Sequence, residues 1–266
     1  MGLAPPQKAQ RLFLVRHGES EGNVNKDVHR QTPDHFISVT ERGWREQILP
    51  CGTFLRAHIA KEGGLENRRF ALWHSSFLRA CQTAKGIHMA IQDLNPEVHM
   101  RDSLGEISYG HADGLGDEVA AQEYPDYGSQ RQRDSSHNTM HFLRFPNGES
   151  RADVGVRVRL FIESLQRKVK ESGITDHIVV THGVTLRVIV KEWLNLHFSE
   201  TDQEKNPGNC DVRLIARRTE GVGFEDCGYI YRRGLVVEPQ IVPHRRAIDR
   251  MASDEYIPRF ARPNIG

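Results

Sequence analysis

The chain of 266 residues lacks several features that would place a protein in a class at once. It has few cysteines and no CxxC pair, so the sequence predicts neither a zinc site nor a dense disulfide framework. No run approaches the roughly twenty apolar residues of a membrane-spanning helix, and residues 1–10 contain no apolar core resembling a signal peptide. We therefore expect a soluble, cytoplasmic protein. The four cysteines, interpreted as free thiols, are Cys51, Cys81, Cys210 and Cys227.

An excess of charge of one sign is also missing. Lysine and arginine number 36 against 35 acidic residues, and the net charge of +1 gives no reason to expect nucleic acid or an anionic membrane as a partner. The sequence has neither an HExxH motif nor clustered aspartate and histidine, so we expect no metal and no other cofactor. An apolar fraction of 38% is enough for one substantial core, which predicts a single domain over residues 1–266. The sequence does not indicate an oligomeric state.

What the sequence does contain is an alternation of short β-prone runs and helical patterns. The run 177–181 has a fully apolar centre, which is typical of a strand buried on both faces of a parallel sheet. The alternation predicts an α/β fold, a three-layer α/β/α sandwich with a mostly parallel central sheet and a core over about residues 11–200. The predicted strands are 11–15, 70–73 and 177–181, and the predicted helices are about 40–59, divided or kinked at Pro50, 75–91, capped by Ser75 or Ser76, and 152–169.

Two segments lie outside this alternation. Residues 110–150 are rich in glycine, charged and amide residues with little periodicity, so we expect an inserted, irregular cap over the sheet edge. A C-terminal extension over about 206–266 offers two β-like runs, 212–216 and 228–232, that could form a hairpin, followed by a proline-containing tail. The basic residues of the cap could recognise a second acidic group on a ligand, or simply be solvated. These are Arg131, Arg133, His137, His141 and Arg144.

Polar residues suited to phosphoryl transfer follow the predicted strands or begin the predicted helices. In a parallel sheet these ends converge on one crevice, where helix N-termini present free N–H groups to an anion. Guanidinium groups and a protonated imidazole stabilise the charge of a transferred phosphoryl group, which suits Arg16, Arg79 and His182. His17 can be the nucleophile if one ring nitrogen is free and a neighbouring acceptor holds the other. Any one of these residues alone would more often be an ion pair or a loop residue, so the interpretation depends on their joint arrangement.

Four ordered segments resemble the signature of the histidine phosphatase, or phosphoglycerate mutase-like, superfamily, and the resemblance spans roughly residues 11–195. A bare Arg-His-Gly motif would be a weak signal, whereas four segments in the family's order form a strong one. The segments are Arg16-His17-Gly18-Glu19 through Asn23, Ser75 to Ala84, Leu104-Gly105-Glu106, and Thr181-His182-Gly183.

The resemblance implies a role for each matching position. His17 would become the phosphohistidine, and Glu106 would protonate the leaving group and then activate water. A carboxyl in that position must be protonated for the first step and ionised for the second. Other branches of the superfamily place an aspartate near the second histidine instead, but Val184 stands there, so Glu106 is favoured. The residues expected to bind the phosphoryl group are Arg16, Ser20, Asn23, Arg79, His182 and Gly183, with Ser20 equally able to cap a short helix.

The family contains both phosphatases and mutases, and the insertion distinguishes them. The cofactor-dependent mutases carry an Arg-Arg-Ser-aromatic-Asp run there, and residues 110–148 contain no such run. Gly22 also stands where those mutases usually have tryptophan. We therefore expect a phosphatase for small phosphorylated substrates, with phosphoglycerate mutase or sugar bisphosphatase activity as the alternative. A phospholigand-binding protein without turnover is a third interpretation, which the complete set of catalytic residues disfavours.

Overall fold

The computed structural model describes residues 11–61, 68–137, 139–202, 204–218 and 223–244. The predictions for residues 1–10 and for the tail beyond His244 lie outside this part of the chain. Its seven strands form one sheet in the order β3-β2-β4-β1-β5-β6-β7. The strands are β1 (Arg11–Arg16), β2 (Phe70–His74), β3 (Glu97–Met100), β4 (Asp176–Thr181), β5 (Val212–Arg217), β6 (Phe224–Arg232) and β7 (Leu235–Val236). The described helices contain none that is both long and apolar enough to cross a membrane.

The sheet has a parallel half and an antiparallel half. Strands β3, β2, β4 and β1 pair in parallel, as the alternating pattern predicts. Strand β5 then pairs antiparallel with β1, and β6 and β7 follow antiparallel. The expected hairpin of β5 and β6 is therefore present. The sheet is therefore mixed. It continues past residue 200, because β5 of the predicted C-terminal extension pairs with β1, and β6 and β7 follow it.

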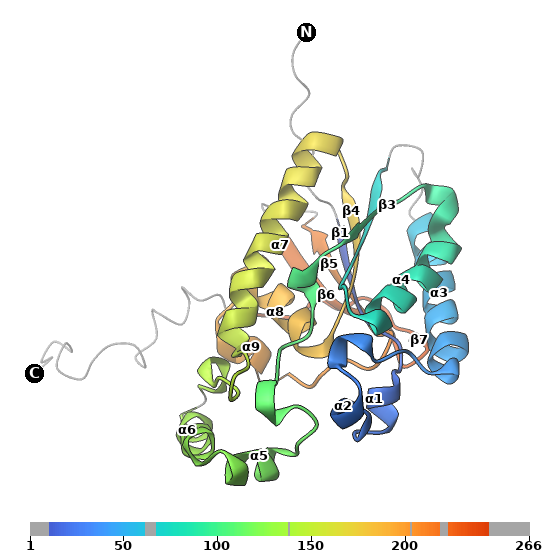
Figure 1. The fold of residues 1–266 in the computed structure, drawn as a ribbon. Coiled ribbons are helices and arrows are strands. Elements are labelled where there is room, and N and C mark those ends of the chain that lie inside the picture. Colours follow the sequence, from blue (N-terminus) through green and yellow to red (C-terminus); the bar gives the residue numbers. More distant parts are fainter. Residues whose placement is uncertain (1–10, 62–67, 138, 203, 219–222, 245–266) are drawn as a thin grey trace, which may run out of the picture.

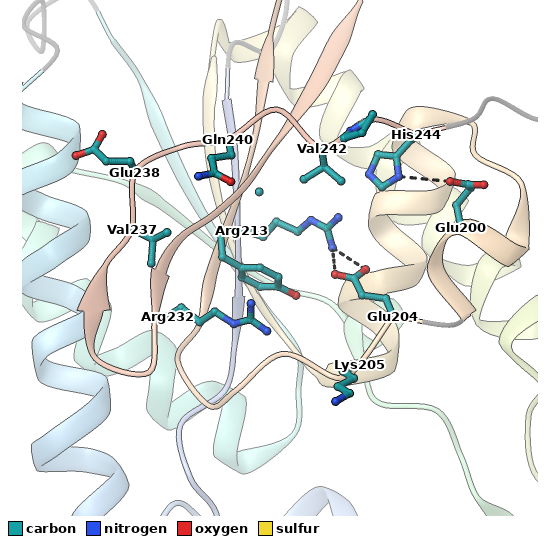
Figure 2. A pocket seen from close by; sticks show the side chains of 13 residues that line it. Glu200, Glu204, Lys205, Arg213, Arg232, Val237, Glu238, Gln240, Val242 and His244 are labelled. Carbon is teal, nitrogen blue, oxygen red and sulfur yellow. Dashed lines mark hydrogen bonds and ion pairs between the residues drawn. The ribbon is translucent and has the colours of Figure 1, made fainter.

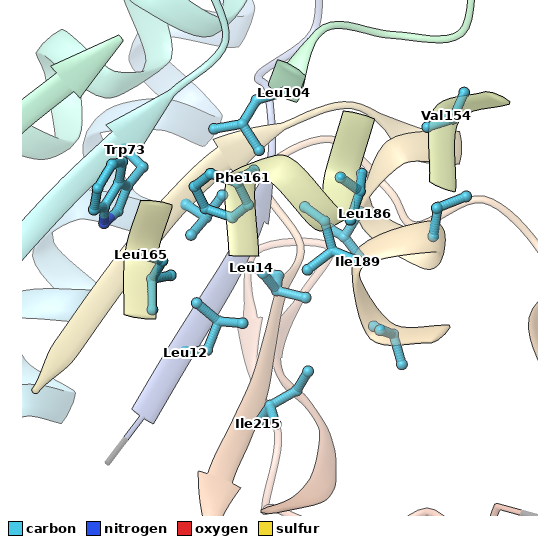
Figure 3. Packing of buried hydrophobic residues seen from close by; sticks show 14 of the residues in the cluster. Leu12, Leu14, Trp73, Leu104, Val154, Phe161, Leu165, Leu186, Ile189 and Ile215 are labelled. Carbon is cyan, nitrogen blue, oxygen red and sulfur yellow. The ribbon is translucent and has the colours of Figure 1, made fainter. Parts of the chain in front are cut away.

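Helices cover both faces of the sheet and make it a three-layer sandwich (Figure 1). Strand β1 shows why, because Leu12 and Leu14 lie in one apolar cluster and Phe13 and Val15 in the other. The first cluster packs α7 (Arg151–Ser172) and α8 (Gly183–Leu194) on one face, where Figure 3 shows Leu165 and Leu186 beside Leu14. The second cluster packs α3 (Leu49–Lys61) and α4 (Leu78–Ile91) on the other face.

One helix agrees with the sequence prediction, and the start of another differs from it. The helix expected over 40–59 is present over residues 41–61, and a π-helical stretch, η2 (Gly43–Ile48), passes directly into α3 just before Pro50, which offers no N–H to an earlier carbonyl. Thr40 Oγ1 accepts a hydrogen bond from Gly43 N–H at 2.9 Å near this start. The expected serine cap of α4 is wrong, because the N-cap residue is Phe77.

The cap is more regular than predicted. Residues 110–148 contain the helices α5 (Asp117–Glu123) and α6 (Pro125–Ser136), with the 3-10 turns η6 (Gly110–Ala112) and η7 (Met140–Phe142). Helix α6 is polar almost all round and buries only Tyr127 among its residues, so it has no apolar stripe for a periodicity argument to detect. Figure 1 shows α5 and α6 at the end of the molecule where the short helices α1 (Glu21–Val24) and α2 (Val28–Gln31) also lie.

Candidate active site

The carboxyl ends of three parallel strands bring the predicted motifs together. The register pairs Arg16 with Thr181 and His74 with Val180, so these strands end side by side. The residues that follow directly are His17, His182 and Ser75. The rings of His17 and His182 are 5.1 Å apart between centroids. The convergence expected at this edge of the sheet is therefore present in the structure.

His17 is held in the state that a histidine nucleophile requires. Its Nδ1 lies 2.7 Å from the carbonyl oxygen of Gly18, which can only accept, so Nδ1 carries the proton. Nε2 accepts a hydrogen bond from Arg79 Nε at 3.3 Å and is therefore unprotonated. Burial lowers the pKa of His17 well below its ordinary value, and the charges of Arg79 and Arg16 lower it further. The ring is neutral, with a lone pair at Nε2.

Hydrogen bonds fix the position of Gly18, whose carbonyl oxygen accepts from His17 Nδ1. Its N–H donates to Thr83 Oγ1 at 2.9 Å, and that hydroxyl donates to the carbonyl oxygen of Arg79 at 2.7 Å. A Cβ at Gly18 would lie 2.5 Å from Cγ1 of Ile48, so a side chain would displace either residue. The Arg-His-Gly motif therefore needs glycine here because the chain passes close to η2.

The two arginines next to His17 are bound differently, and Arg16 is half-buried whereas Arg79 is buried. Arg16 Nη1 donates to the carbonyl oxygen of Pro207 at 2.6 Å, whereas its buried Nε has no hydrogen-bond partner within the described ranges. Burial lowers the pKa of Arg16, an effect that the charges of Glu106 and Asp211 oppose. Arg79 is 5% exposed, and both of its terminal nitrogens contact Asp34. Together they supply charge-assisted donors next to the nucleophile.

His182 is neutral in the ligand-free site, which differs from the protonated imidazole expected from the sequence. It is fully buried, and burial lowers its pKa well below the ordinary value, with the charges of Arg79 and His17 adding to this. Its Nε2 is 2.9 Å from Ser75 Oγ, so Ser75 serves His182 where the sequence predicts a helix cap. Its Nδ1 is buried, and the structure records no partner for it among the residues described.

Glu106 lies on the loop after Leu104, next to the N-terminus of α8. Three other side chains hydrogen-bond to the backbone of this loop. The Glu106 carboxylate accepts from the N–H groups of Val184 at 3.4 Å and Thr185 at 3.3 Å. Thr181 Oγ1 donates to the Leu104 carbonyl oxygen and Thr185 Oγ1 to that of Gly105. Arg157 donates to the carbonyl oxygens of Ser103, Gly105 and Glu106. The charge of Glu106 acts to raise the pKa of Arg16, so these two groups are close enough to interact.

Three further predicted residues lie within six positions of His17 or directly after His182 in the chain. Ser20 precedes α1 as its N-cap residue, and its backbone N–H donates to Asn23 Oδ1 at 3.1 Å. Asn23 Oδ1 also accepts from Asn209 Nδ2 at 3.0 Å, and both contacts leave the Asn23 amide N–H groups to donate. Gly183 begins α8, so its N–H is one of those without an intrahelical acceptor. Their contacts with a phosphoryl group stay predictions.

Several site residues were not predicted from the sequence. Asn209 donates to the His17 carbonyl oxygen at 3.0 Å across 192 positions, a separation that no local pattern reveals. Tyr109 is partly buried near Glu106, and desolvation together with that carboxylate raises its pKa. Asp34 binds Arg79 from the irregular stretch after α2. The signal for Tyr109 was its place three residues after Glu106 in the predicted loop, whereas Asp34 offers no comparable signal.

Three of the five basic residues named in the cap lie next to acidic residues. Arg131 contacts Asp117 at 2.6 Å. Arg144 forms an ion pair with Asp153. His141 lies 3.4 Å from Asp202. These contacts favour the interpretation of the cap as a surface whose charges are locally neutralised.

A cavity of about 610 Å³ lies elsewhere, behind the antiparallel half of the sheet (Figure 2). It is lined by residues of β5, β6 and the following segment, and it contains none of the predicted site residues. One of the lining residues is Arg213, which is 2% exposed and pairs with Glu204 and with the buried Asp226. His244 Nε2 is 2.7 Å from Asp226 Oδ2 and attaches the end of the described chain to this cluster.

The fold and the convergent residues define an α/β protein with a cationic cradle around a neutral, buried histidine. The family model of the histidine phosphatase superfamily (branch 1) matches residues 12–228. The chain belongs to this superfamily and is an enzyme of the histidine phosphatase family.

Individual proteins agree with this assignment. The chain is 30% identical over 231 residues to the phosphoglycerate mutase-like protein AT74H of Arabidopsis thaliana, covering 80% of this chain and 75% of that protein. It is 26% identical to the broad-range acid phosphatase DET1 of Saccharomyces cerevisiae, covering 77% of this chain and 84% of that protein. A solved structure of a putative α-ribazole-5'-P phosphatase from Escherichia coli superposes with a TM-score of 0.63 at 20% identity, covering 86% of this chain and 99% of that one. The last comparison supports the fold.

Proposed function

We propose that this enzyme hydrolyses phosphomonoesters through a phosphohistidine formed at Nε2 of His17. The observation that carries the proposal is the state of that ring. Nδ1 is bound to the Gly18 carbonyl oxygen, Nε2 is unprotonated, and Arg79 Nε is 3.3 Å from Nε2. A neutral imidazole with its lone pair directed toward a cationic group is ready to attack the phosphorus of an anionic ester.

The first step forms the N–P bond and breaks the P–O bond to the leaving group. As Nε2 attacks phosphorus, the Glu106 carboxyl gives its proton to the departing alkoxide. Arg16 Nε and His182 Nδ1, both buried and unpaired in the described chain, would acquire phosphoryl oxygens as partners. Arg79 supports the same group from the side of its Nε. An arriving dianion would also favour proton uptake by His182.

The second step returns His17 to its starting state. The Glu106 carboxylate accepts a proton from water, the water oxygen attacks phosphorus, and the N–P bond breaks to release inorganic phosphate and the neutral imidazole. No electron acceptor or further reactant is required. Because Thr181, Thr185 and Arg157 hold the Glu106 loop, one carboxyl can serve both steps from one position.

Water is the proposed acceptor, rather than a second metabolite. A mutase must keep water from its phosphoenzyme while the substrate turns over, and the cap here lacks the Arg-Arg-Ser run of the mutases. We propose small phosphorylated metabolites in the cytoplasm as substrates. The mutase-like name of the Arabidopsis relative keeps phosphoglycerate mutase or sugar bisphosphatase activity as the alternative.

A substrate panel tests the proposal. Purified protein should release phosphate from p-nitrophenyl phosphate and from several small monoesters, whereas His17→Ala should release none above background. Glu106→Gln should lose turnover of substrates with poor leaving groups while still binding phosphate. Interconversion of phosphoglycerates without phosphate release would contradict the hydrolase and favour the mutase. Phosphate binding with no reaction of either kind would favour the binding-protein interpretation.

A further inference from the structure

A carboxylate occupies one edge of the Arg79 guanidinium inside the cradle. Asp34 belongs to the turn η1 (Asp34–Phe36), and its Oδ1 and Oδ2 lie 2.9 Å and 3.0 Å from Nη1 and Nη2 of Arg79. The Asp34 carbonyl oxygen accepts from Nη1 as well, at 2.5 Å. The Arg79 side chain is 6% exposed and that of Asp34 is 22% exposed, so the pair is largely screened from water. In this fork Nη2 donates a hydrogen bond to Oδ2, and Nη1 forms an ion pair with Oδ1.

The fork leaves the other edge of Arg79 directed at the nucleophile. A guanidinium has an end-on edge formed by Nη1 and Nη2, and a side-on edge formed by Nε and the second hydrogen of Nη2. Asp34 takes the end-on edge, and Nε faces His17 Nε2 at 3.3 Å. A phosphoryl group carried by His17 would therefore meet Arg79 at its side-on edge. The position of Asp34 determines which edge that is.

His29 on α2 lies next to Asp34. Its Nδ1 is 3.5 Å from Asp34 Oδ1 and 3.4 Å from Asp113 Oδ1, at the start of the cap, and makes no hydrogen bond within the described residues. A Cβ on Gly22 would lie 2.5 Å from Nε2 of this ring, so the glycine that replaces the tryptophan of the mutases makes the space for His29. The His29 ring thus lies close to the carboxylates of both Asp34 and Asp113.

The Asp34 charge has opposite effects on ground-state binding and on catalysis. An ionised carboxylate beside the cradle offsets part of the positive charge that attracts a phosphate dianion. The same carboxylate restricts Arg79 to the orientation in which its side-on edge meets the transferred group. Removing the charge should therefore strengthen phosphate binding and weaken turnover. A residue that merely stabilised the fold would not separate the two quantities in this way.

We propose that Asp34 is a positioning residue that binds the end-on edge of Arg79. It weakens the binding of phosphate in the ground state, and it orients the side-on edge of Arg79 toward the phosphoryl group in the transition state. The turnover part of this inference rests on the proposed phosphatase function. The binding part does not, because inorganic phosphate can be titrated without any reaction.

Asp34→Asn removes the charge and keeps the size of the side chain. We expect the Kd for inorganic phosphate, measured by calorimetry, to fall about 3- to 10-fold, and kcat with p-nitrophenyl phosphate to fall about 10-fold or more. His29→Gln acts from outside the cradle and leaves the Asp34 charge in place, so it should lower kcat by less and leave the Kd for phosphate unchanged. Asp93→Asn is the matched control, because it removes an Asp–Arg fork with Arg56 on the surface and should change neither.

The phosphate affinity and the turnover of these variants decide whether Asp34 positions Arg79. Tighter phosphate binding together with slower turnover, in an Asp34→Asn variant whose thermal unfolding matches the wild type, supports this positioning role. An unchanged or weaker phosphate affinity in Asp34→Asn overturns it. If the wild type binds phosphate and releases none from any monoester, the phosphatase function fails, while the comparison of phosphate affinities still decides the role of Asp34.

Discussion

Two buried guanidinium groups lie on neighbouring strands and have opposite surroundings. Arg213 on β5 has carboxylates around it, with Asp226 on Nε and Nη2 and Glu204 on Nη1. Arg16 at the end of β1 has the Pro207 carbonyl oxygen on Nη1, and its Nε is unpaired in the part of the molecule that the structure describes. A buried charge is tolerated when it is paired, so an incompletely paired one indicates a missing partner. This contrast is what we expect if Arg213 is structural and Arg16 binds the phosphoryl group in the proposed reaction.

The pKa directions agree with this contrast. Burial alone would lower the pKa of Arg213, but the hydrogen bond and charge of Asp226 raise it overall. Burial alone would raise the pKa of Asp226, but hydrogen bonds from His244 and Arg213 lower it to about 2. For Arg16 burial dominates, and the pKa is lowered. In the antiparallel half of the sheet, the buried charge of Arg213 is balanced by carboxylates. At the carboxyl ends of the parallel strands, the charge of Arg16 is balanced less completely.

The largest effect on stability is expected from Arg213→Met. This change takes the arginine away from the buried Asp226, which keeps its contacts with His244 and the Gly228 N–H, so the free energy of unfolding should fall by about 3–5 kcal/mol in denaturant titrations. The double variant Arg213→Met/Asp226→Leu removes both charges and should recover at least half of that loss. A single variant within about 1 kcal/mol of the wild type would show that the cluster is not structural.

The same replacement at the other arginine should act on catalysis. Arg16→Met removes a donor from the cradle without leaving a paired carboxylate behind, so kcat/KM should fall about 100- to 1000-fold. The free energy of unfolding should change by less than about 1 kcal/mol, or rise, because an uncompensated buried charge is lost. Parallel activity and denaturation measurements on the two methionine variants check this. Equal destabilisation by both would remove the distinction between the two clusters.

The two regions should contribute differently to the pH dependence of the free energy of unfolding, and this effect is smaller. The pKa values of His17 and His182 are lowered in the fold, so the unfolded chain binds protons that the folded chain does not as the pH falls below about 6.5. Stability should therefore decrease from pH 7 to pH 5, by at most about 2 kcal/mol for each histidine. The contribution of Asp226 has the other sign, because its lowered pKa adds stability above about pH 4 that is lost toward pH 2.

Denaturation curves at several pH values measure this separation. The slope between pH 7 and pH 5 should be smaller in His17→Gln than in the wild type, because one of the two groups is gone. His137→Gln is the control, since His137 is exposed on the cap and should leave the slope unchanged. A slope identical in the wild type and in His17→Gln would contradict a neutral, buried His17.

The sequence predicted the parts of the site that follow strands, because a strand and its exit loop are local. Arg16, His17 and His182 come within one or two residues of a strand end, so the parallel arrangement was enough to bring them together. Glu106 was predicted by resemblance, and the structure explains its loop by Thr185 and Arg157.

Other parts had no local signal. Asp34 reaches Arg79 from an irregular stretch, and Asn209 reaches His17 across most of the chain. The cap helices have few apolar residues, so hydrophobic periodicity could not reveal them. The pairing of β5 with β1 depends on a chain reversal after α9 (Phe198–Asp202), which makes part of the predicted extension an integral part of the sheet.

The most direct test of the central claim is to identify the phosphorylated atom. Glu106→Gln exposed to labelled p-nitrophenyl phosphate should accumulate phosphoenzyme, because the good leaving group needs no proton while the water step lacks its base. The account predicts one acid-labile, alkali-stable phosphoryl group, located by NMR on Nε2 of His17. Labelling on another residue, or labelling that persists when His17→Ala is added, would contradict it.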